Sequence, residues 1–372
     1  MIAHLPPDKQ FRYHSVVRIR NSILALGFLF IFCQCFLNAD QIPNPRSVSL
    51  WSLGNPRFPT AFWVSGSDPD FWHQMDRLYW LDSKQIAIIF YHGGCCVLWA
   101  PGPPSYEVRA VTFDLSGQRK ALRDWHVDES HKRRALQGPG GYVVVTSEDG
   151  LEFFNFELAT VKTITIPNKS TLWVSKNGGD SFALRTPSEL LFYPRGPLDP
   201  PSRLAIPVSD KATPEDILGT SAIFNGKCGA DVWQLGRDGF WRAWTGGNQQ
   251  SNCLRPLALL SQDSFLAGGQ NGISIVHRNG EVETVSQLEG KVLETTPQSG
   301  RFLVQAFRPN AMAQALDMDF GGTKRFLVYD ISSHRVIFEH EYAGDAGAAL
   351  SPDGHHLAIV EHRKLLIYDL PD

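Results

Sequence analysis

The body of the sequence lacks any long block of like charge. Lysine and arginine together number 35, aspartate and glutamate 38, and the formal net charge is -3. Proteins that bind nucleic acid or adhere to an anionic membrane normally carry a concentrated basic surface. The charge distribution therefore indicates neither partner. The most basic stretch, residues 119–134, is interrupted by acidic residues and is expected to form a solvated edge.

The short motifs of common active sites are also missing. The chain has no Gly-x-Ser-x-Gly nucleophile elbow, no His-Glu-x-x-His zinc pair, no phosphate-binding glycine loop and no paired Cys-x-x-Cys knuckles. We therefore predict no catalytic residue, no resident metal and no cofactor. Whether the chain is an enzyme stays open, because a fold can bring scattered residues together at one site.

The N-terminus has the layout of a secretory signal. Residues 23–37 are apolar apart from Gly27 and Gln34, a basic segment precedes them, and cleavage after Ala39 is possible. The apolar run is shorter than the roughly 20 residues that a spanning helix needs. We predict a signal peptide at residues 1–39 and export of residues 40–372 to the periplasm or the exterior. The alternative is an uncleaved membrane anchor at residues 23–37.

Few cysteines remain after this segment. Export permits disulfides, and four cysteines allow three connectivities. The preferred pairing joins Cys228 to Cys253, which flank one predicted hairpin, and Cys95 to Cys96, which share a glycine-rich loop. Buried or partly free thiols are the alternative, and for Cys95 and Cys96 the two possibilities have equal weight.

Turn-forming residues are plentiful, with 32 glycines and 24 prolines. They favour many short strands. The C-terminal residues show the pattern most clearly: strands are predicted at 346–350, 355–360 and 365–370, separated by the turn Ser351-Pro352-Asp353-Gly354 and by a charged turn at 361–364. This arrangement is typical of one blade of a β-propeller.

The same pattern recurs through the chain. Turns between the second and third predicted strands of each unit, several with Asp-Gly or Asn-Gly, fall near residues 99, 149, 188, 238, 271, 315 and 363. Spacings of about 30 to 50 residues predict a propeller with one four-stranded antiparallel sheet per repeat. We predict an all-β domain of seven blades, within a range of six to eight. An antiparallel sandwich of the same strands is the competing fold, but it does not require regular spacing.

The last unit has only three strands before the chain ends. Residues 47–53 form the unused predicted strand, with Val48 and Leu50 alternating with polar residues. We therefore predict that this N-terminal strand pairs beside residues 365–370 and closes the ring, which protects an open sheet edge.

Two segments also carry a family resemblance. The run Leu350-Ser351-Pro352-Asp353-Gly354, followed by a strand that ends in Tyr368-Asp369, resembles the WD40-like and YVTN-like β-propeller repeats of exported bacterial proteins. The run that ends in Tyr329-Asp330 resembles them too. The chain departs from true WD40 repeats in having Tyr-Asp where Trp-Asp is expected, and it has no regular Gly-His dipeptide opening each blade.

Two long loops, residues 92–107 and 308–323, join second and third strands in blades one and six. Such loops emerge on one face of a propeller, and the turn at 361–364 in blade seven would lie between them. Candidate binding residues on this surface are His92, Cys95, Cys96, Asp317, Asp319, His362 and Arg363. The alternative, with equal weight, is that the loops are solvated elaborations or cover the channel. A soft-metal site is disfavoured, because adjacent cysteines do not readily chelate one ion.

These observations favour a binding or interaction module. We expect a monomer that recognises a protein or a small-molecule ligand through the loops at residues 92–107 and 308–323 and the turn at 361–364. The alternative is a hydrolase of the lactonase type with its site at the mouth of the central channel.

Overall fold

The structure is a computed structural model of the chain. It describes residues 44–54, 77–91, 105–128, 134–137, 141–147, 150–166, 171–174, 181–204, 214–224, 231–236, 241–243, 255–269, 272–286, 290–309, 322–344 and 346–372. The chain divides into two units, Met1–Asn44 and Pro45–Asp372. The description below concerns the second unit.

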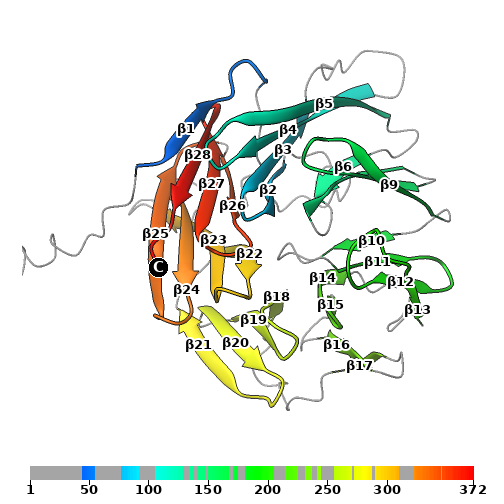
Figure 1. The fold of residues 1–372 in the computed structure, drawn as a ribbon. Helices are drawn as coiled ribbons and strands as arrows, with labels where there is room; N and C mark the ends of the chain where they lie inside the picture. The colour runs from blue at the N-terminus through cyan, green and yellow to red at the C-terminus, as the bar shows by residue number, and fades with distance from the viewer. Residues whose placement is uncertain are drawn as a thin grey trace, which may run out of the picture. The chain divides into compact units, whose positions relative to one another are not determined.

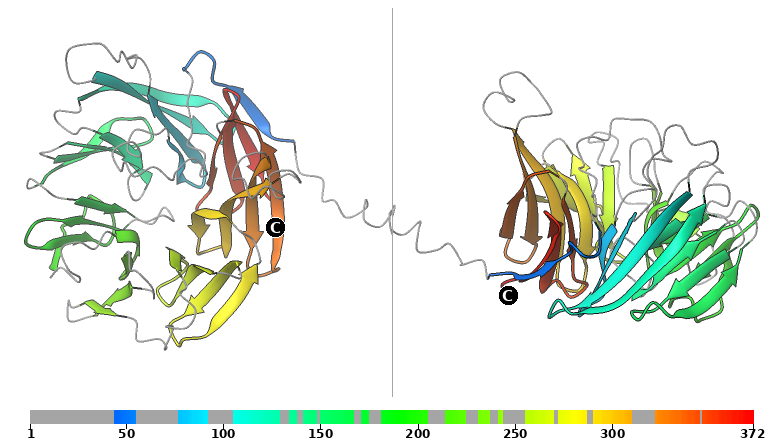
Figure 2. Two further views of the ribbon diagram at one scale, coloured as in Figure 1. Left: turned by 180° about the vertical axis from the view of Figure 1, so that it is seen from behind. Right: turned by 90° about the horizontal axis from the view of Figure 1, so that it is seen from above.

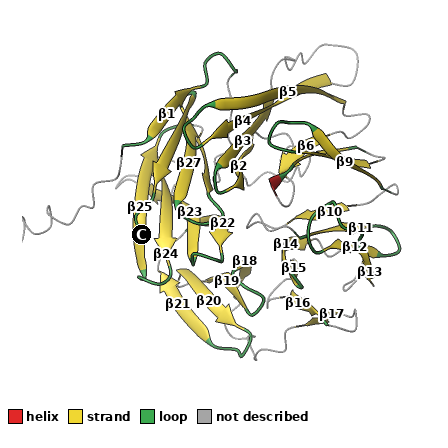
Figure 3. Ribbon diagram, in the orientation of Figure 1, coloured by secondary structure: helices red, strands yellow, loops and turns green. Residues whose placement is uncertain are grey.

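Strands account for nearly all of the regular structure of this unit (Figure 3). The first sheet contains β2 (Arg77–Asp82), β3 (Gln85–Tyr91), β4 (Ser105–Asp114) and β5 (Arg119–Asp128). The second contains β6 (Arg134–Gln137), β7 (Val143–Thr146), β8 (Gly150–Phe154) and β9 (Thr160–Thr165). The third contains β10 (Thr171–Val174), β11 (Phe182–Arg185), β12 (Leu190–Tyr193) and β13 (Ser202–Leu204).

The next three sheets repeat this organisation. The fourth contains β14 (Pro214–Leu218), β15 (Ser221–Phe224), β16 (Asp231–Leu235) and β17 (Trp241–Ala243). The fifth contains β18 (Arg255–Leu259), β19 (Ser264–Gly269), β20 (Gly272–His277) and β21 (Val282–Ser286). The sixth contains β22 (Lys291–Thr296), β23 (Arg301–Pro309), β24 (Gly322–Asp330) and β25 (Arg335–Tyr342).

The seventh sheet differs in the origin of its strands. It contains β26 (Ala346–Leu350), β27 (His356–Glu361) and β28 (Lys364–Asp369), and its fourth member is β1 (Arg46–Ser49). Figure 1 shows the seven sheets arranged as the blades of a propeller, and Figure 2 shows this unit from two further directions. The predicted all-β, seven-bladed propeller is confirmed.

Nearly all of the middle strands of the blades are buried on both faces. In β20, five consecutive residues are buried, whereas the outer strand β9 is almost fully exposed. A strand with apolar residues at consecutive positions presents an apolar surface on both sides of its sheet, so each side needs a partner. The neighbouring blades supply these partners.

The buried residues group into clusters that lie between neighbouring blades. Within the described residues, separate clusters join blades one and two, two and three, three and four, four and five, five and six, and six and seven. A further cluster joins the last blade to the first, and it contains Trp80 and Phe90 of blade one with Val360 and Leu365 of blade seven. Apolar packing therefore continues around the whole ring.

Hydrogen bonds cross several of these interfaces. Trp80 Nε1 donates to the carbonyl oxygen of Ala349 over 2.9 Å, which joins blades one and seven. The buried carboxylate of Asp216 in blade four accepts the backbone N–H of Leu259 in blade five at 2.8 Å. Such bonds satisfy polar groups that the packing removes from water.

The N-terminal strand pairs with the C-terminal one. β1 runs antiparallel to β28, with Arg46 opposite Ile367 and Ser49 opposite Lys364. The strand is shorter than the predicted residues 47–53. After Ser49 the chain turns, Leu53 N donates to Leu50 O over 2.9 Å, and both leucines enter the cluster between blades seven and one.

Blade four also departs from the sequence prediction. The sequence of residues 217–224 predicts a single strand, whereas the structure has the end of β14, a turn at Gly219 and Thr220, and the strand β15 in this segment. Gly219 has a φ of 55°, which lets the chain reverse there. The residues near 238, which were predicted to join the second and third strands, therefore follow the third strand β16 and precede the fourth strand β17.

One carboxyl group links the inner strands of blades six and seven. Glu294 of β22 accepts the backbone N–H of Leu350 at the end of β26. Burial raises the pKa of Glu294 from 4.5 to about 8, and the hydrogen bond from Leu350 only partly offsets this effect. Between these two pKa values, Glu294 keeps its proton in the folded protein but loses it in the unfolded chain.

We expect deletion of residues 40–53 to lower the free energy of unfolding by more than about 5 kcal/mol. The deletion removes the β1–β28 pairing and the burial of Leu50 and Leu53, and each buried leucine contributes roughly 1.5–3 kcal/mol. Urea unfolding measures the change, with a deletion of residues 1–39 as the control. Unchanged unfolding after the longer deletion would mean that β1 does not hold the ring together.

We expect Glu294 to make the protein less stable as the pH rises. A carboxyl whose pKa is raised on folding contributes its full stability below the unfolded pKa of 4.5, and this contribution is lost as the pH rises through about 8. Glu294→Gln keeps an acceptor for Leu350 N but does not titrate, so its unfolding free energy should vary less over this range. Parallel profiles for both proteins, measured by denaturant unfolding, would contradict the assignment.

Candidate functional site

The turn between β27 and β28 has an unusual backbone conformation. Glu361 pairs with Lys364, and the two residues between them, His362 and Arg363, have φ values of 46° and 60°. Tight two-residue hairpin turns need positive φ, and Asn or Gly normally supplies it. A non-glycine residue in this region costs of order 1 kcal/mol or more. The predicted charged turn is therefore present, and it is strained at two consecutive positions.

An exposed tryptophan lies beside this turn. Trp51 follows β1 and has 68% of its surface exposed, and the guanidinium carbon of Arg363 lies 4.1 Å from the centre of its ring. The backbone connects the same two segments, because Leu50 N donates to Arg363 O over 2.8 Å. Leu50 and Leu53 are buried on either side of Trp51, so the chain turns its indole outward. We call Trp51, His362, Arg363 and Lys364 the turn patch.

Sequence reasoning missed Trp51, because residues 47–53 were predicted as one alternating strand. The available signal was the spacing of Leu50 and Leu53, which lie three positions apart with Trp51 and Ser52 between them. Alternation places residues three apart on opposite faces of a strand. Two leucines at this spacing can enter the same core only if the chain turns.

A partly buried polar cluster connects the turn to blade six. His340 Nε2 of β25 lies 3.2 Å from Glu361 Oε2, and the two side chains are only 17% and 16% exposed. The hydroxyl of Tyr368 lies 3.4 Å from His340 Nδ1. Burial and the nearby charge of Glu361 raise the pKa of Tyr368, so this hydroxyl keeps its proton at neutral pH. The acidic residue of the turn thus points into the protein, not outward.

Blade one is connected to the same region. Arg109 of β4 donates from Nη1 to the carbonyl oxygen of Leu53 over 2.8 Å, and the same guanidinium binds Asp124 through two hydrogen bonds of 2.8 Å. Arg109 pairs with Phe90 close to the end of β3, where the long loop at residues 92–107 begins. Arg109 therefore fixes the turn after β1 to the end of blade one at which the loop of residues 92–107 begins.

All of the other predicted site residues lie outside the described residues. Two of the seven candidate binding residues, His362 and Arg363, belong to the turn patch. The predicted residues outside the described part of the chain are His92, Cys95, Cys96, Asp317, Asp319, Cys228 and Cys253. It does describe the strand ends that bound the two long loops, at Tyr91 and Ser105 and at Pro309 and Gly322.

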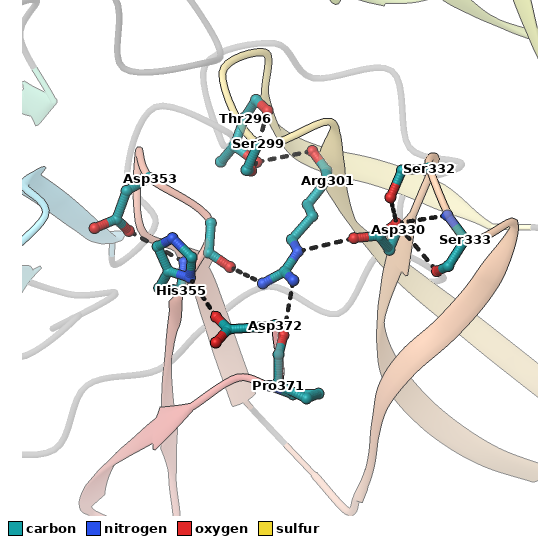
Figure 4. A network of polar contacts seen from close by, with 11 residues as sticks. Thr296, Ser299, Arg301, Asp330, Ser332, Ser333, Asp353, His355, Pro371 and Asp372 are labelled. Carbon is teal, nitrogen blue, oxygen red and sulfur yellow. Dashed lines mark hydrogen bonds and ion pairs between the residues drawn. The ribbon is translucent and has the colours of Figure 1, made fainter.

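A second polar network lies at the other end of blades six and seven (Figure 4). Arg301 at the start of β23 donates from Nε to Asp330 at 3.1 Å, and the two side chains are 5% and 9% exposed. The same guanidinium donates to the backbone carbonyl oxygens of Gly354 at 2.8 Å and Pro371 at 2.7 Å. It thereby joins blade six to the turn between β26 and β27 and to the C-terminal residues that follow β28.

The carboxylate of Asp330 is held in its charged form. Burial alone would raise its pKa, but hydrogen bonds from Ser332, Ser333 and Arg301 outweigh this effect and lower the pKa to about 2. A carboxylate with such a low pKa is a poor proton acceptor at neutral pH. The arrangement is suited to joining the blades and not to acid–base chemistry.

The two Tyr-Asp dipeptides of the sequence have matching roles. Asp330 in blade six binds Arg301, which stands opposite it in the strand pair. Asp369 in blade seven binds His356, also its strand partner, at 2.9 Å. In both blades the aspartate at the end of the third strand fixes the start of the second, so these dipeptides are structural.

Three further kinds of site concern the described residues, namely a metal site, a membrane-spanning helix and a hydrolase site. Among the described residues, no three His, Cys, Asp or Glu side chains are grouped so that they could hold a metal ion. Nor does this part of the chain contain a helix long and apolar enough to cross a membrane. No described side-chain arrangement supports the hydrolase alternative.

The chain resembles known proteins in its fold. No family model matches the sequence, and no curated protein matches it. A chain in the crystal structure of the mitotic checkpoint complex superposes with a TM-score of 0.50 at 12% identity, covering 88% of this chain and 94% of that one. The Neurospora crassa Pan2 WD40 domain gives a TM-score of 0.48 at 10% identity, covering 89% of this chain and 98% of that one. With its seven four-stranded antiparallel blades, the chain has the fold of a WD40-like β-propeller.

Proposed function

We propose that the protein is an interaction module whose recognition face comprises the loops at residues 92–107 and 308–323 and the turn at 361–364. The turn patch carries this proposal. Its backbone is strained at two adjacent positions, and an exposed tryptophan is stacked against it. Strained backbone persists only where the surrounding structure holds it, and it is concentrated at binding and active sites. Tryptophan and arginine are also the residues that most often dominate protein interfaces.

Two contacts support a shared face for the three connections. His340 near the loop end of blade six contacts Glu361 at the turn of blade seven. Arg109 near the loop end of blade one contacts Leu53 beside the same turn. In each blade the connection joins the second strand to the third, which places equivalent connections on one side of a propeller. The described strand ends are therefore consistent with loops that surround the turn patch.

The proposal also includes the cellular location of the protein. The basic and then apolar residues that precede the propeller support export to the periplasm or the exterior, or anchoring through residues 23–37. In either case, a monomeric propeller would present the recognition face to a partner protein or a small-molecule ligand.

Affinity capture from the native exported fraction tests the proposed function. We expect wild-type protein to retain a partner that is lost when both long loops are shortened. A protein shortened instead at the turn after β12, in the region of the exposed Leu198, is the control for a nonspecific effect of loop removal. Equal capture by all three proteins would show that the proposed face does not recognise the partner.

Replacing His362 and Arg363 by Asn and Gly should separate stability from binding. The double variant relieves positive φ at both positions, so we expect the unfolding free energy to rise by about 1–2 kcal/mol and partner capture to weaken. The matched control is His334→Gly, which relieves a φ of 53° in the turn between β24 and β25, at the other end of blade six. This control should gain stability and keep full capture. Binding that survives in the double variant would contradict a functional role for the turn.

A further inference from the structure

The strand that closes the ring is attached differently from the other outer strands. In blades one to six, the fourth strand follows the third strand in the chain, and the connection between them keeps it close to its partner. In blade seven the fourth strand is β1, which precedes all the others, and the next strand begins only at Arg77. Figure 1 shows β1 at the outer side of β28. The closing strand can therefore leave its site without the opening of a hairpin.

The contacts that hold β1 in this site are few. None of its four residues is fully buried, and the ion pair between Arg46 and Asp369 is exposed to solvent. The buried contacts come from the turn that follows, where Leu50 and Leu53 enter the cluster between blades seven and one. Exposed ion pairs contribute little to stability, so the strand pair and the two leucines provide most of the attachment. Segments with few buried contacts open before the rest of a structure does.

The site that β1 occupies recognises an extended chain in two ways. Without β1, the edge of β28 would present backbone donors and acceptors from Lys364 to Ile367. Beyond this edge, blades seven and one surround the positions of Leu50 and Leu53. Arg109 marks the far end of the site, because it donates to the carbonyl oxygen of Leu53. The site therefore takes a short strand that is followed by two apolar side chains at this spacing.

We propose that this site exchanges its occupant, so that residues 46–53 of a second copy of the chain close the ring in place of the molecule's own strand. A second copy is the partner that the contacts favour, because it carries the very segment that fits the site. Exchange of an identical element between protomers is a low-cost route to a dimer. The inference goes beyond the proposed function, and an exchanged pair would carry two recognition faces.

Protein concentration decides between the closed monomer and the exchanged pair, because the contacts of β1 are the same in both. A strand that is joined to its own site through the chain has an effective concentration of order 1 mM. At about 1 mM protein, roughly half of the molecules should therefore be exchanged, whereas at about 10 μM only a few per cent should be. The closed monomer is thus the dominant form in dilute solution.

Disulfide trapping tests the exchange in the full chain. Ser49 stands opposite Lys364, and both residues are exposed. Opposed residues of antiparallel strands have Cα atoms about 4.5–5.5 Å apart, which is within the range of a disulfide. The Ser49→Cys and Lys364→Cys proteins are mixed in a mildly oxidising buffer, at about 1 mM and at about 10 μM. Peptide mapping detects a link between positions 49 and 364, which we expect to be at least about tenfold more abundant at the higher concentration.

Two controls make the result specific. A chain with both substitutions should form the same link within one molecule, which verifies the geometry. Glu107→Cys mixed with His126→Cys provides an exposed, directly opposed pair on β4 and β5, whose strands are consecutive in the chain. These strands should not exchange, so this mixture should form no link between molecules. A thermal melt checks that each variant folds.

Three results would overturn the inference. The first is the absence of the 49–364 link between molecules at the higher concentration, when the doubly substituted chain forms it. The second is an equally abundant link between positions 107 and 126, because the molecules would then meet through unfolding or random collision. The third is a wild-type dimer, detected by light scattering, when the 49–364 link does not form on mixing, because another surface would then join the copies. None of these measurements involves a partner protein, so their outcome leaves the proposed function unaffected.

Discussion

A four-stranded sheet with apolar residues on both faces of its middle strands needs a neighbour on each side. A stack of such sheets always leaves two faces in water unless the last sheet reaches the first. The cluster that contains Trp80, Phe90, Val360 and Leu365 joins those two sheets in this protein. The polar links follow the same interfaces, since Glu294 and Arg301 each connect blade six to blade seven. The position of every other element, including the turn patch, depends on this circular packing.

The sequence was sufficient to predict the fold because its signals are local and repeated. Consecutive apolar residues identify the buried middle strands, and turn formers separate them at a steady spacing. The prediction failed where one of these signals was weak. Gly219 and Thr220 make a two-residue turn inside a run of β-forming residues, so two strands were predicted as one. Likewise, the apparent alternation at residues 47–53 concealed a turn that exists because Leu50 and Leu53 enter the same cluster.

The candidate site was predictable only in part. His362 and Arg363 were recognised because a short charged turn between two apolar strands is a local pattern. Trp51 and His340 were missed because their partners are distant in sequence: Trp51 contacts Arg363, and His340 contacts Glu361 in the next blade. Contacts of this kind result from strand register and blade packing, and one sequence contains no direct sign of either. The backbone strain at the turn was not predicted either, because only a few per cent of non-glycine residues adopt positive φ.

The strained turn can be weighed against the other left-handed residues of the described chain. Leu158 is buried among the residues between blades one and two, and His334 lies 3.7 Å from Glu283 of the neighbouring blade. Each therefore has a packing or polar contact that accompanies its conformation. His362 and Arg363 are adjacent, so their costs add, and glycine would relieve the strain at either position as it does at Gly354 and Gly280. What glycine could not provide is the guanidinium on Trp51 or an exposed imidazole beside it. The turn therefore keeps two functional side chains at the cost of a strained backbone. Those side chains face outward where blades six, seven and one meet.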